Sequence, residues 1–274
     1  MLRQKPRADQ VATVRESWSS YAAALRKTHR LWQCSFMRTL EDPSSDPHFR
    51  LRLLSVWAAN MVHVSFNFPR YAATLAARAE EDAVRHGLLE NAWDESGGAK
   101  HAARSHVWLA VGLARFVGIA DDEIEKLEPL PGARRYTAEH LRSAREQEEI
   151  LFPLGMICLI EEWAVPLFQF LQTAYERALV SAQVPLARFE QQGRAYFVQN
   201  IRDDRRHRMD MPQVLAAVLD SRGIRLDDSQ SITQALEPAR RGAEYSADLR
   251  VQFYDEVFGF VKSGRSERDL VRAR

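Results

Sequence analysis

The residue types most able to bind a metal ion gather in one stretch of the chain, Tyr196 to His207. This stretch contains neither Gly nor Pro, so it is expected to be helical. In a helix Asn200, Asp204 and His207 lie at i, i+4 and i+7 and share one face. A carboxylate and an imidazole are costly to bury unless they are paired or bind a metal. The spacing therefore indicates a metal site or, as the simpler alternative, ion pairs with neighbouring arginines.

Three further acids and imidazoles stand at unexpected places. Glu95 comes just before a Gly-Gly helix break, His106 lies on an apolar helix face, and Glu162 interrupts the apolar stretch 151–171. Each alone is more typical of a structural residue. Together with the acid and the histidine of the first stretch they supply three carboxylates and two imidazoles. Such O and N ligands suit iron or manganese, and helical bundles build dinuclear sites from them, whereas structural zinc sites favour Cys.

The elements that must position these residues are predicted to be helices. Apolar residues recur every three or four positions along most of the chain. Helices are expected over residues 11–40, 48–67, 69–79, 82–93, 102–118, 151–171, 173–183, 186–211, 212–219, 229–236 and 240–261. Pro69 is expected to start a new helix, and the charged segment 136–150 is expected to be solvated. The chain has no strand-period run, no GxGxxG, no P-loop and no CxxC pair, so the fold class is all-α.

Length and charge set the broad class. The 274 residues fit one domain, with a flexible N-terminal segment 1–10, a single helical domain 11–261 and a charged C-terminal tail 262–274 that is expected to fray. Lys plus Arg (38) nearly equal Asp plus Glu (37), which argues against nucleic acid and anionic membranes as partners. The longest apolar run, 150–160, is too short to span a bilayer, and the N-terminus lacks the apolar segment of a signal peptide. A cytoplasmic location is expected.

Three blocks in a fixed order carry a family resemblance. They are Glu90-Asn91-Ala92-Trp93-Asp94-Glu95-Ser96-Gly97-Gly98 followed by His106, then Glu162 four residues before Pro166, then Tyr196-Phe197-x-x-Asn200-x-x-x-Asp204-x-x-His207. With Phe68-Pro69-Arg70, these blocks resemble the haem-oxygenase-like di-iron oxidases, whose fold is shared with pyrroloquinoline quinone synthase-like and thiaminase II-like proteins. The resemblance covers residues 48–260 and implies a haem-oxygenase-like helical bundle of about seven or more helices.

The resemblance also implies the metal ligands, which are Glu95, His106, Glu162, Asp204 and His207. Asn200 stands where the family has a third histidine, and a neutral amide is a weaker ligand for Fe(II) than imidazole. Two Fe(II) per chain are therefore expected, with one site weak. His101 and His63 are candidate substitutes for the missing imidazole. One family branch uses a Lys in a self-sacrificing reaction. Gln172 stands at that position in this chain, so that activity is not inferred.

The leading functional hypothesis is an O2-dependent non-haem iron oxidase with O2 as co-substrate. It would act on a small amine, amino acid or fatty-acid-like metabolite by N-oxygenation, desaturation or C–C cleavage in a biosynthetic pathway. An external electron donor and a homodimer are further expectations. Arg70, Arg202 and Arg205 lie near the motifs and make a carboxylate-bearing substrate plausible. The alternatives are a metal-free or mononuclear quinone-synthase-like enzyme and a catalytically silent helical binding or partner protein.

Overall fold

The computed structural model describes residues 6–98 and 105–271. In these residues the chain forms eleven α-helices and no β-strand, so the predicted all-α class and the expectation of about seven or more helices are confirmed. The helices are α1 (Ala8–Thr28), α2 (Ser35–Glu41), α3 (Pro47–Arg78), α4 (Asp82–Glu95), α5 (His106–Phe116), α6 (Asp121–Ile124), α7 (Pro131–Glu146), α8 (Leu151–Ser181), α9 (Arg194–Ser221), α10 (Ser229–Ala235) and α11 (Glu237–Lys262). Short helices η1 (Arg30–Gln33), η2 (Phe189–Gly193, a π-helix) and η3 (Glu267–Leu270) complete the order.

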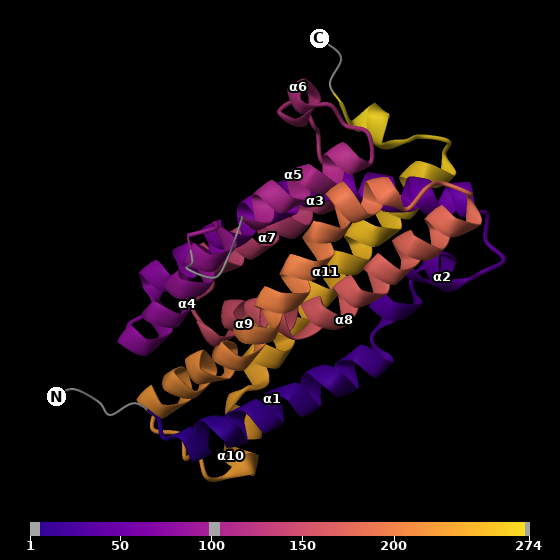
Figure 1. The fold of residues 1–274 in the computed structure, drawn as a ribbon. Coiled ribbons are helices and arrows are strands. Elements are labelled where there is room, and N and C mark those ends of the chain that lie inside the picture. Colours follow the sequence, from indigo (N-terminus) through magenta and orange to yellow (C-terminus); the bar gives the residue numbers. More distant parts are fainter. Residues whose placement is uncertain (1–5, 99–104, 272–274) are drawn as a thin grey trace.

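The long helices form one elongated bundle (Figure 1). Helix α8 packs against α9 and α11, and α3 packs against α4, α5 and α7. Helix α1 lies along the outside of the bundle and contacts α9 (Figure 1). The core between these helices is built from fully buried aromatic and aliphatic side chains, among them Trp57, Trp163, Tyr175 and Phe197. Burial of such large side chains is the main term that stabilises the bundle.

Three prolines lie inside helices rather than at their ends. Helix α3 runs through Pro69, α8 through Pro166 and α9 through Pro212, so the expected new start at Pro69 is wrong. A proline inside a helix removes one backbone hydrogen bond and costs about 3 kcal/mol. On α3 the residues on both sides of the proline, Phe68 and Tyr71, are buried in the core. Their packing outweighs the local preference of proline, and the helix continues.

Two charged segments are more ordered than expected. Segment 136–150 was expected to be solvated, but α7 buries one face that includes Tyr136 and His140. The tail was expected to fray, but η3 buries Leu270, whose carbonyl oxygen accepts a hydrogen bond of 2.8 Å from the Glu128 amide. At the other end, α1 begins at Ala8, within the segment expected to be flexible. A few apolar residues are enough to dock these charged segments.

Helices α8 and α11 cross closely through two glycines. A Cβ atom on Gly155 would overlap the backbone of Ala239, and a Cβ atom on Gly242 would overlap the backbone of Phe152. The absence of a side chain at both positions therefore lets the two backbones touch. This contact fixes the position of α8, which carries Glu161.

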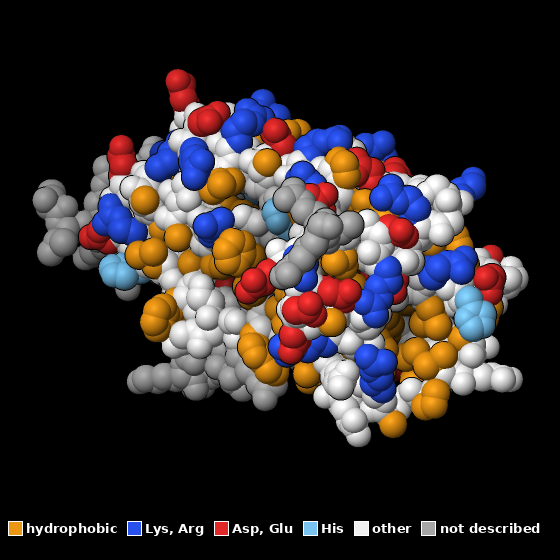
Figure 2. Space-filling model, turned by 90° about the horizontal axis from the view of Figure 1, so that it is seen from above, with side chains coloured by type: hydrophobic (Ala, Val, Ile, Leu, Met, Phe, Trp, Pro, Cys, Tyr) orange, Lys and Arg blue, Asp and Glu red, His pale blue; other side chains and the backbone are white. Residues whose placement is uncertain are grey.

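Helix α8 is also long and apolar enough to cross a membrane by length and composition, but 72% of its most apolar window is buried inside the protein. The outer surface is mixed in charge. Figure 2 shows acidic and basic side chains interspersed over the face seen from above. This mixture matches the near balance of 38 basic and 37 acidic residues in the sequence.

Candidate metal centre

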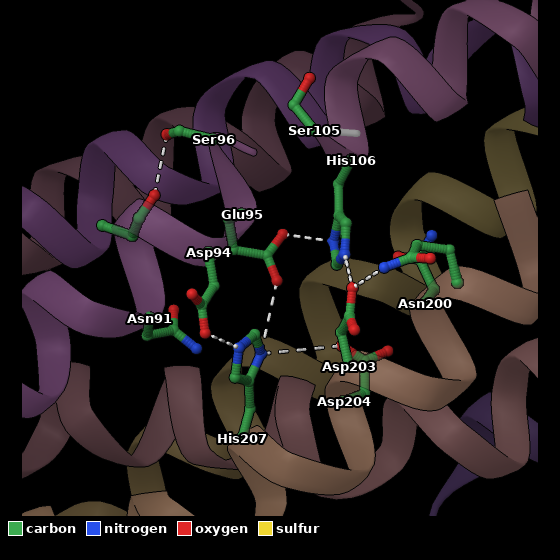
Figure 3. Close-up of polar contacts among 12 residues, drawn as sticks. Asn91, Asp94, Glu95, Ser96, Ser105, His106, Asn200, Asp203, Asp204 and His207 are labelled. Carbon is green, nitrogen blue, oxygen red and sulfur yellow. Dashed lines mark hydrogen bonds and ion pairs between the residues drawn. The ribbon is translucent and has the colours of Figure 1, made fainter. Parts of the chain in front are cut away.

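Acidic and imidazole side chains from four helices converge at one buried point of the bundle (Figure 3). Glu95 is the last residue of α4 and His106 is the first residue of α5. Glu161 comes from the middle of α8, and Asp204 and His207 from α9. None of these five residues is more than 6% exposed. The bundle thus brings together four of the residues predicted from the sequence, together with Glu161.

The donor atoms divide into two groups that share one residue. Glu95, Glu161 and His207 form the first group, and Glu95, His106 and Asp204 form the second. In each group the three donor atoms lie within 4.8 Å of one another. Since metal–ligand bonds are about 2.0–2.6 Å long, each group is compact enough for one ion. Shared by both groups, the Glu95 carboxylate is placed to bridge two ions.

His106 lies between a carboxylate of the cluster and an outer aspartate. Its Nδ1 atom is 2.5 Å from Glu95 Oε2, and its Nε2 atom is 3.4 Å from Asp203 Oδ2. Metal-binding histidines usually offer one nitrogen to the ion and hold the other against a carboxylate, which fixes the ring. His106 has this arrangement, with Asp203 as the outer partner.

His207 repeats the arrangement. Its Nδ1 atom faces Glu161 Oε2 at 3.4 Å and Glu95 Oε1 at 3.5 Å, while its Nε2 atom lies 3.4 Å from Asp94 Oδ2 (Figure 3). The Asp94 carboxylate is held in turn by the Arg206 guanidinium. Both imidazoles therefore direct Nδ1 into the cluster and Nε2 toward an aspartate.

Asp94 and Asp203 are site residues that sequence reasoning missed. Each stands immediately before a predicted ligand, Glu95 or Asp204, and neighbouring positions on a helix point about 100° apart. The Asp203 carboxylate accepts hydrogen bonds from Gln199 and from Arg202 Nε, the latter at 3.3 Å. The acidic doublets Asp94-Glu95 and Asp203-Asp204 are the signal that would have indicated them.

The structure places Glu161, rather than Glu162, in the cluster. Glu161 Oε1 accepts a hydrogen bond of 2.7 Å from Asn91 Nδ2, and the other oxygen faces His207. Glu162 turns away, and its Oε1 atom pairs with Arg208 at 2.6 Å. Because the two acids are adjacent on α8, only one of them can face the cluster. The spacing of four residues before Pro166 pointed to Glu162, but it depends on the sequence alone and not on which acid faces the cluster. The expectation that Glu162 is a ligand is therefore wrong.

The other predicted residues lie as follows. Asn200 lines the same cavity as Glu95, and its Nδ2 atom donates a hydrogen bond of 2.6 Å to the Tyr196 carbonyl oxygen. His63 lies in neither donor group, and its Nε2 atom contacts Thr137 Oγ1 at 2.8 Å. His63 is therefore held in the framework of the fold instead of replacing the missing imidazole. His101 lies outside the described residues.

Protonation of the metal-free cluster follows from burial and crowding. Burial alone lowers the pKa of His207, but the carboxylates of Glu161 and Glu95 outweigh it and raise that pKa to about 10. Burial likewise lowers the pKa of His106, and Glu95 and Asp203 raise it to about 10. Burial and repulsion from Glu161 raise the pKa of Asp204 well above its usual value. Protons on these groups therefore balance the crowded carboxylates in the metal-free cluster, and a bound cation would take their place.

Two donor atoms of the cluster indicate that its residues fit a metal ion. Asp204 Oδ2 is buried and forms no hydrogen bond with any described residue, and His207 Nδ1 is buried and faces only carboxylates of the cluster, at 3.4–4.0 Å. Buried polar atoms without partners are rare in proteins, because each costs about 1–3 kcal/mol. Both atoms belong to the groups that converge around Glu95. Oxygen and imidazole donors at this spacing match the preferences of iron and manganese.

A cavity adjoins the cluster and reaches toward α11. It has a volume of about 70 Å³, and Glu95, His106, Glu161 and Asp204 form part of its wall. Most of the other wall residues are apolar or aromatic: Met61, Val64, Phe68, Tyr71, Tyr136, Ile160, Ala164, Phe168 and Tyr196. Since one water molecule needs about 10–15 Å³ of such space, the cavity can hold a molecule of several non-hydrogen atoms.

Comparison with known proteins agrees with this geometry. The model of a family described as iron-containing redox enzymes matches residues 55–238, which is more than half of the chain. No curated protein matches the sequence significantly.

Solved structures share the fold at low sequence identity. A CADD-like protein of unknown function from Nostoc punctiforme PCC 73102 superposes with a TM-score of 0.62 at 15% identity, covering 94% of this chain and 99% of that one. A domain of unknown function with a heme oxygenase-like fold from Shewanella denitrificans OS217 gives 0.57 at 14%, covering 94% and 95%. A TenA homolog from Pseudomonas syringae pv. tomato str. DC3000 gives 0.58 at 12%, covering 94% and 99%. The fold is therefore haem oxygenase-like.

Proposed function

Because this chain belongs to the family of iron-containing redox enzymes, we propose that it is an O2-dependent non-haem di-iron oxidase acting on a small organic metabolite. The observation that carries the proposal is the pair of buried donor groups that share Glu95. A single structural ion would need one group, whereas two groups with a common carboxylate are the arrangement of a dinuclear centre. The cavity beside the donors supplies room for the substrate.

The residues of the chain have separate tasks in this function. Glu95, Glu161 and His207 would hold one iron, and Glu95, His106 and Asp204 the other. Iron bound there would supply the electrons that reduce O2. Asp94 and Asp203 keep the two imidazole rings turned so that Nδ1 faces inward. The apolar wall limits the water that can reach the reacting groups.

An anaerobic Fe(II) titration followed by exposure to O2 tests the proposal. We expect two Fe(II) per chain and Fe(II)-dependent O2 uptake. One Fe(II) per chain would indicate a mononuclear enzyme instead. Neither iron binding nor O2 uptake would leave a helical binding protein as the function. Metal content by elemental analysis, with manganese measured in parallel, identifies the ion that the donors select.

A further inference from the structure

Arg250 lies in the wall of the cavity that contains the cluster residues. It comes from α11, which supplies none of the cluster residues. Arg250 also lines a second, adjoining cavity of about 50 Å³. The two cavities share wall residues from α3, α7, α8 and α11: Met61, Val64, Tyr136, Ile160, Ala164, Phe168 and Arg250. The Arg250 guanidinium therefore lines a mainly apolar chamber that also contains the cluster.

No carboxylate neutralises Arg250 within the described part of the chain. Its NH2 group donates a hydrogen bond of 2.8 Å to Tyr136 Oη, and its Cζ atom lies 5.5 Å from the centre of the Tyr136 ring. The described ion pairs of the protein do not include Arg250, whereas Arg206 and Arg208 pair with the buried acids Asp94 and Glu162. An arginine side chain remains charged in proteins, and Arg250 is half-buried, so its charge is partly removed from water without an ionic partner, which is costly. An anion from outside the chain would remove that cost.

Two tyrosine hydroxyls add to the guanidinium. The Tyr136 oxygen accepts the bond from Arg250, which leaves its own proton to be donated. The Tyr71 hydroxyl is buried, lines the same cavity and has no hydrogen-bond partner among the described residues. Burial raises the pKa of Tyr71 well above its usual value, so this hydroxyl is a neutral donor. The guanidinium and the two hydroxyls all line the cavity and can donate hydrogen bonds to a bound acceptor.

The charges also orient a ligand. Arg250 attracts an anionic group to the α11 side of the cavity, whereas the donor residues Glu95, His106, Glu161 and Asp204 come from other helices. The remaining wall residues favour an apolar body. The arginines that the sequence indicated do not take this role, since Arg70, Arg202 and Arg205 are exposed and none of them lines either cavity.

We propose that Arg250, Tyr136 and Tyr71 bind the carboxylate of a small, mainly apolar organic acid and direct the remainder of that molecule toward the metal cluster. This inference rests on the proposed oxidase function and defines its substrate class. A planar guanidinium matches the two oxygens of a carboxylate, and the tyrosine hydroxyls can donate to the same group. Amines and other cations are excluded by the uncompensated positive charge.

Binding of matched acids and amides tests the inference without turnover. Hexanoate is compared with hexanamide, and 3-phenylpropionate with 3-phenylpropanamide, by calorimetry on Fe(II)-loaded protein under argon. We expect each acid to bind at least about tenfold more tightly than its amide, a difference of ~1.4 kcal/mol. Arg250→Gln should abolish this preference, and Arg250→Lys should retain part of it. Arg241→Gln is the matched control, because Arg241 is an exposed residue of the same helix and lines neither cavity.

Tyr71→Phe provides a second variant that removes only a hydroxyl without a partner, so it should fold even if Arg250→Gln does not. It should weaken acid binding about three- to tenfold and leave amide binding unchanged. Equal affinity for acid and amide in the unmodified protein would overturn the inference. So would an acid preference that survives in Arg250→Gln, because the carboxylate would then be bound by the iron itself.

The two proposals fail in different ways. Fe(II)-dependent O2 uptake without a preference for acids over amides would contradict the carboxylate site at Arg250 and support the oxidase function. An acid preference that depends on Arg250, in a protein that takes up neither iron nor O2, retains the carboxylate site and removes the oxidase.

Discussion

His207 Nδ1 faces the carboxylate of Glu161 at a distance of 3.4 Å, although the two residues lie on different helices. The crossing of α8 and α9 produces this approach and at the same time turns Glu162 outward to Arg208. The two neighbouring acids of α8 therefore form a natural pair for mutagenesis.

Glu161→Gln is expected to lower the Fe(II) affinity by more than about 10–100-fold. That range is typical when a residue that only hydrogen-bonds to a metal ligand is removed, whereas Glu161 would be a ligand itself. The variant should still fold, because repulsion from Glu161 raises the pKa of Asp204 in the metal-free cluster and the substitution relieves that repulsion. Glu162→Gln removes a carboxylate of the same kind one position away and should keep its iron. Iron content and anaerobic titration of both variants make the comparison. Loss of iron in Glu162→Gln alone would reverse the assignment.

Asn200→His should raise iron occupancy at the weaker site. Asn200 is buried on the same face of α9 as Asp204 and lines the cavity beside the cluster. An imidazole there would replace a neutral amide with a stronger ligand for Fe(II). Equal and full occupancy of both sites in the unmodified protein would contradict the expectation of one weak site.

Asp203→Asn tests the outer partner of His106. The substitution leaves every residue of the two donor groups in place but removes the negative charge 3.4 Å from His106 Nε2. We expect Fe(II) affinity at that site to fall by about 10–100-fold. Asp210→Asn, a more distant change on the same helix outside both groups, is the control. Unchanged affinity in Asp203→Asn would assign that residue a structural role only.

Iron binding should release protons at neutral pH. Burial lowers the pKa of His106 and His207, but the surrounding carboxylates raise both to about 10, so both rings are charged at pH 7 in the metal-free protein. A charged ring cannot bind a metal, so Fe(II) affinity should increase with pH throughout the window from about 6.5 to 10 instead of levelling off above 6.5. Anaerobic calorimetry at pH 7 in buffers of different ionisation enthalpy counts the protons. No release would show that both rings are neutral before the metal binds.

Gly242→Ala should destabilise the fold by at least about 1–3 kcal/mol, the usual cost of overpacking, because its Cβ would overlap the backbone of Phe152. Gly259 lies on the same helix with no atom within 4 Å of a Cβ placed there. Gly259→Ala should therefore stabilise the protein by about 0.5–1 kcal/mol through helix propensity. Chemical denaturation of both variants measures the two free energies of unfolding. Equal effects would mean that the α8–α11 contact is looser than described.

Much of the fold could be predicted because helical periodicity is a local property of the sequence. The apolar steps indicated most of the helices, and the spacing of Asp204 and His207 placed both on one face of α9. The continuation of α3 through Pro69 could not be predicted, since it depends on packing against distant helices. The same limit applies to Glu161. The side chains of adjacent helix residues point about 100° apart, and only the packing of α8 against α9 determines whether Glu161 or Glu162 faces the cluster. Nothing in the sequence around Arg250 indicated that it lines a cavity, because an arginine in a charged helix is usually exposed.

The donors also differ in where they lie along their helices. Glu95 ends α4 and His106 begins α5, whereas Glu161, Asp204 and His207 lie well inside α8 and α9. Helix ends are held by fewer backbone hydrogen bonds than helix interiors and open more easily. The donors on α8 and α9 are therefore expected to have the more rigid backbone, and the donors on α4 and α5 the more mobile one.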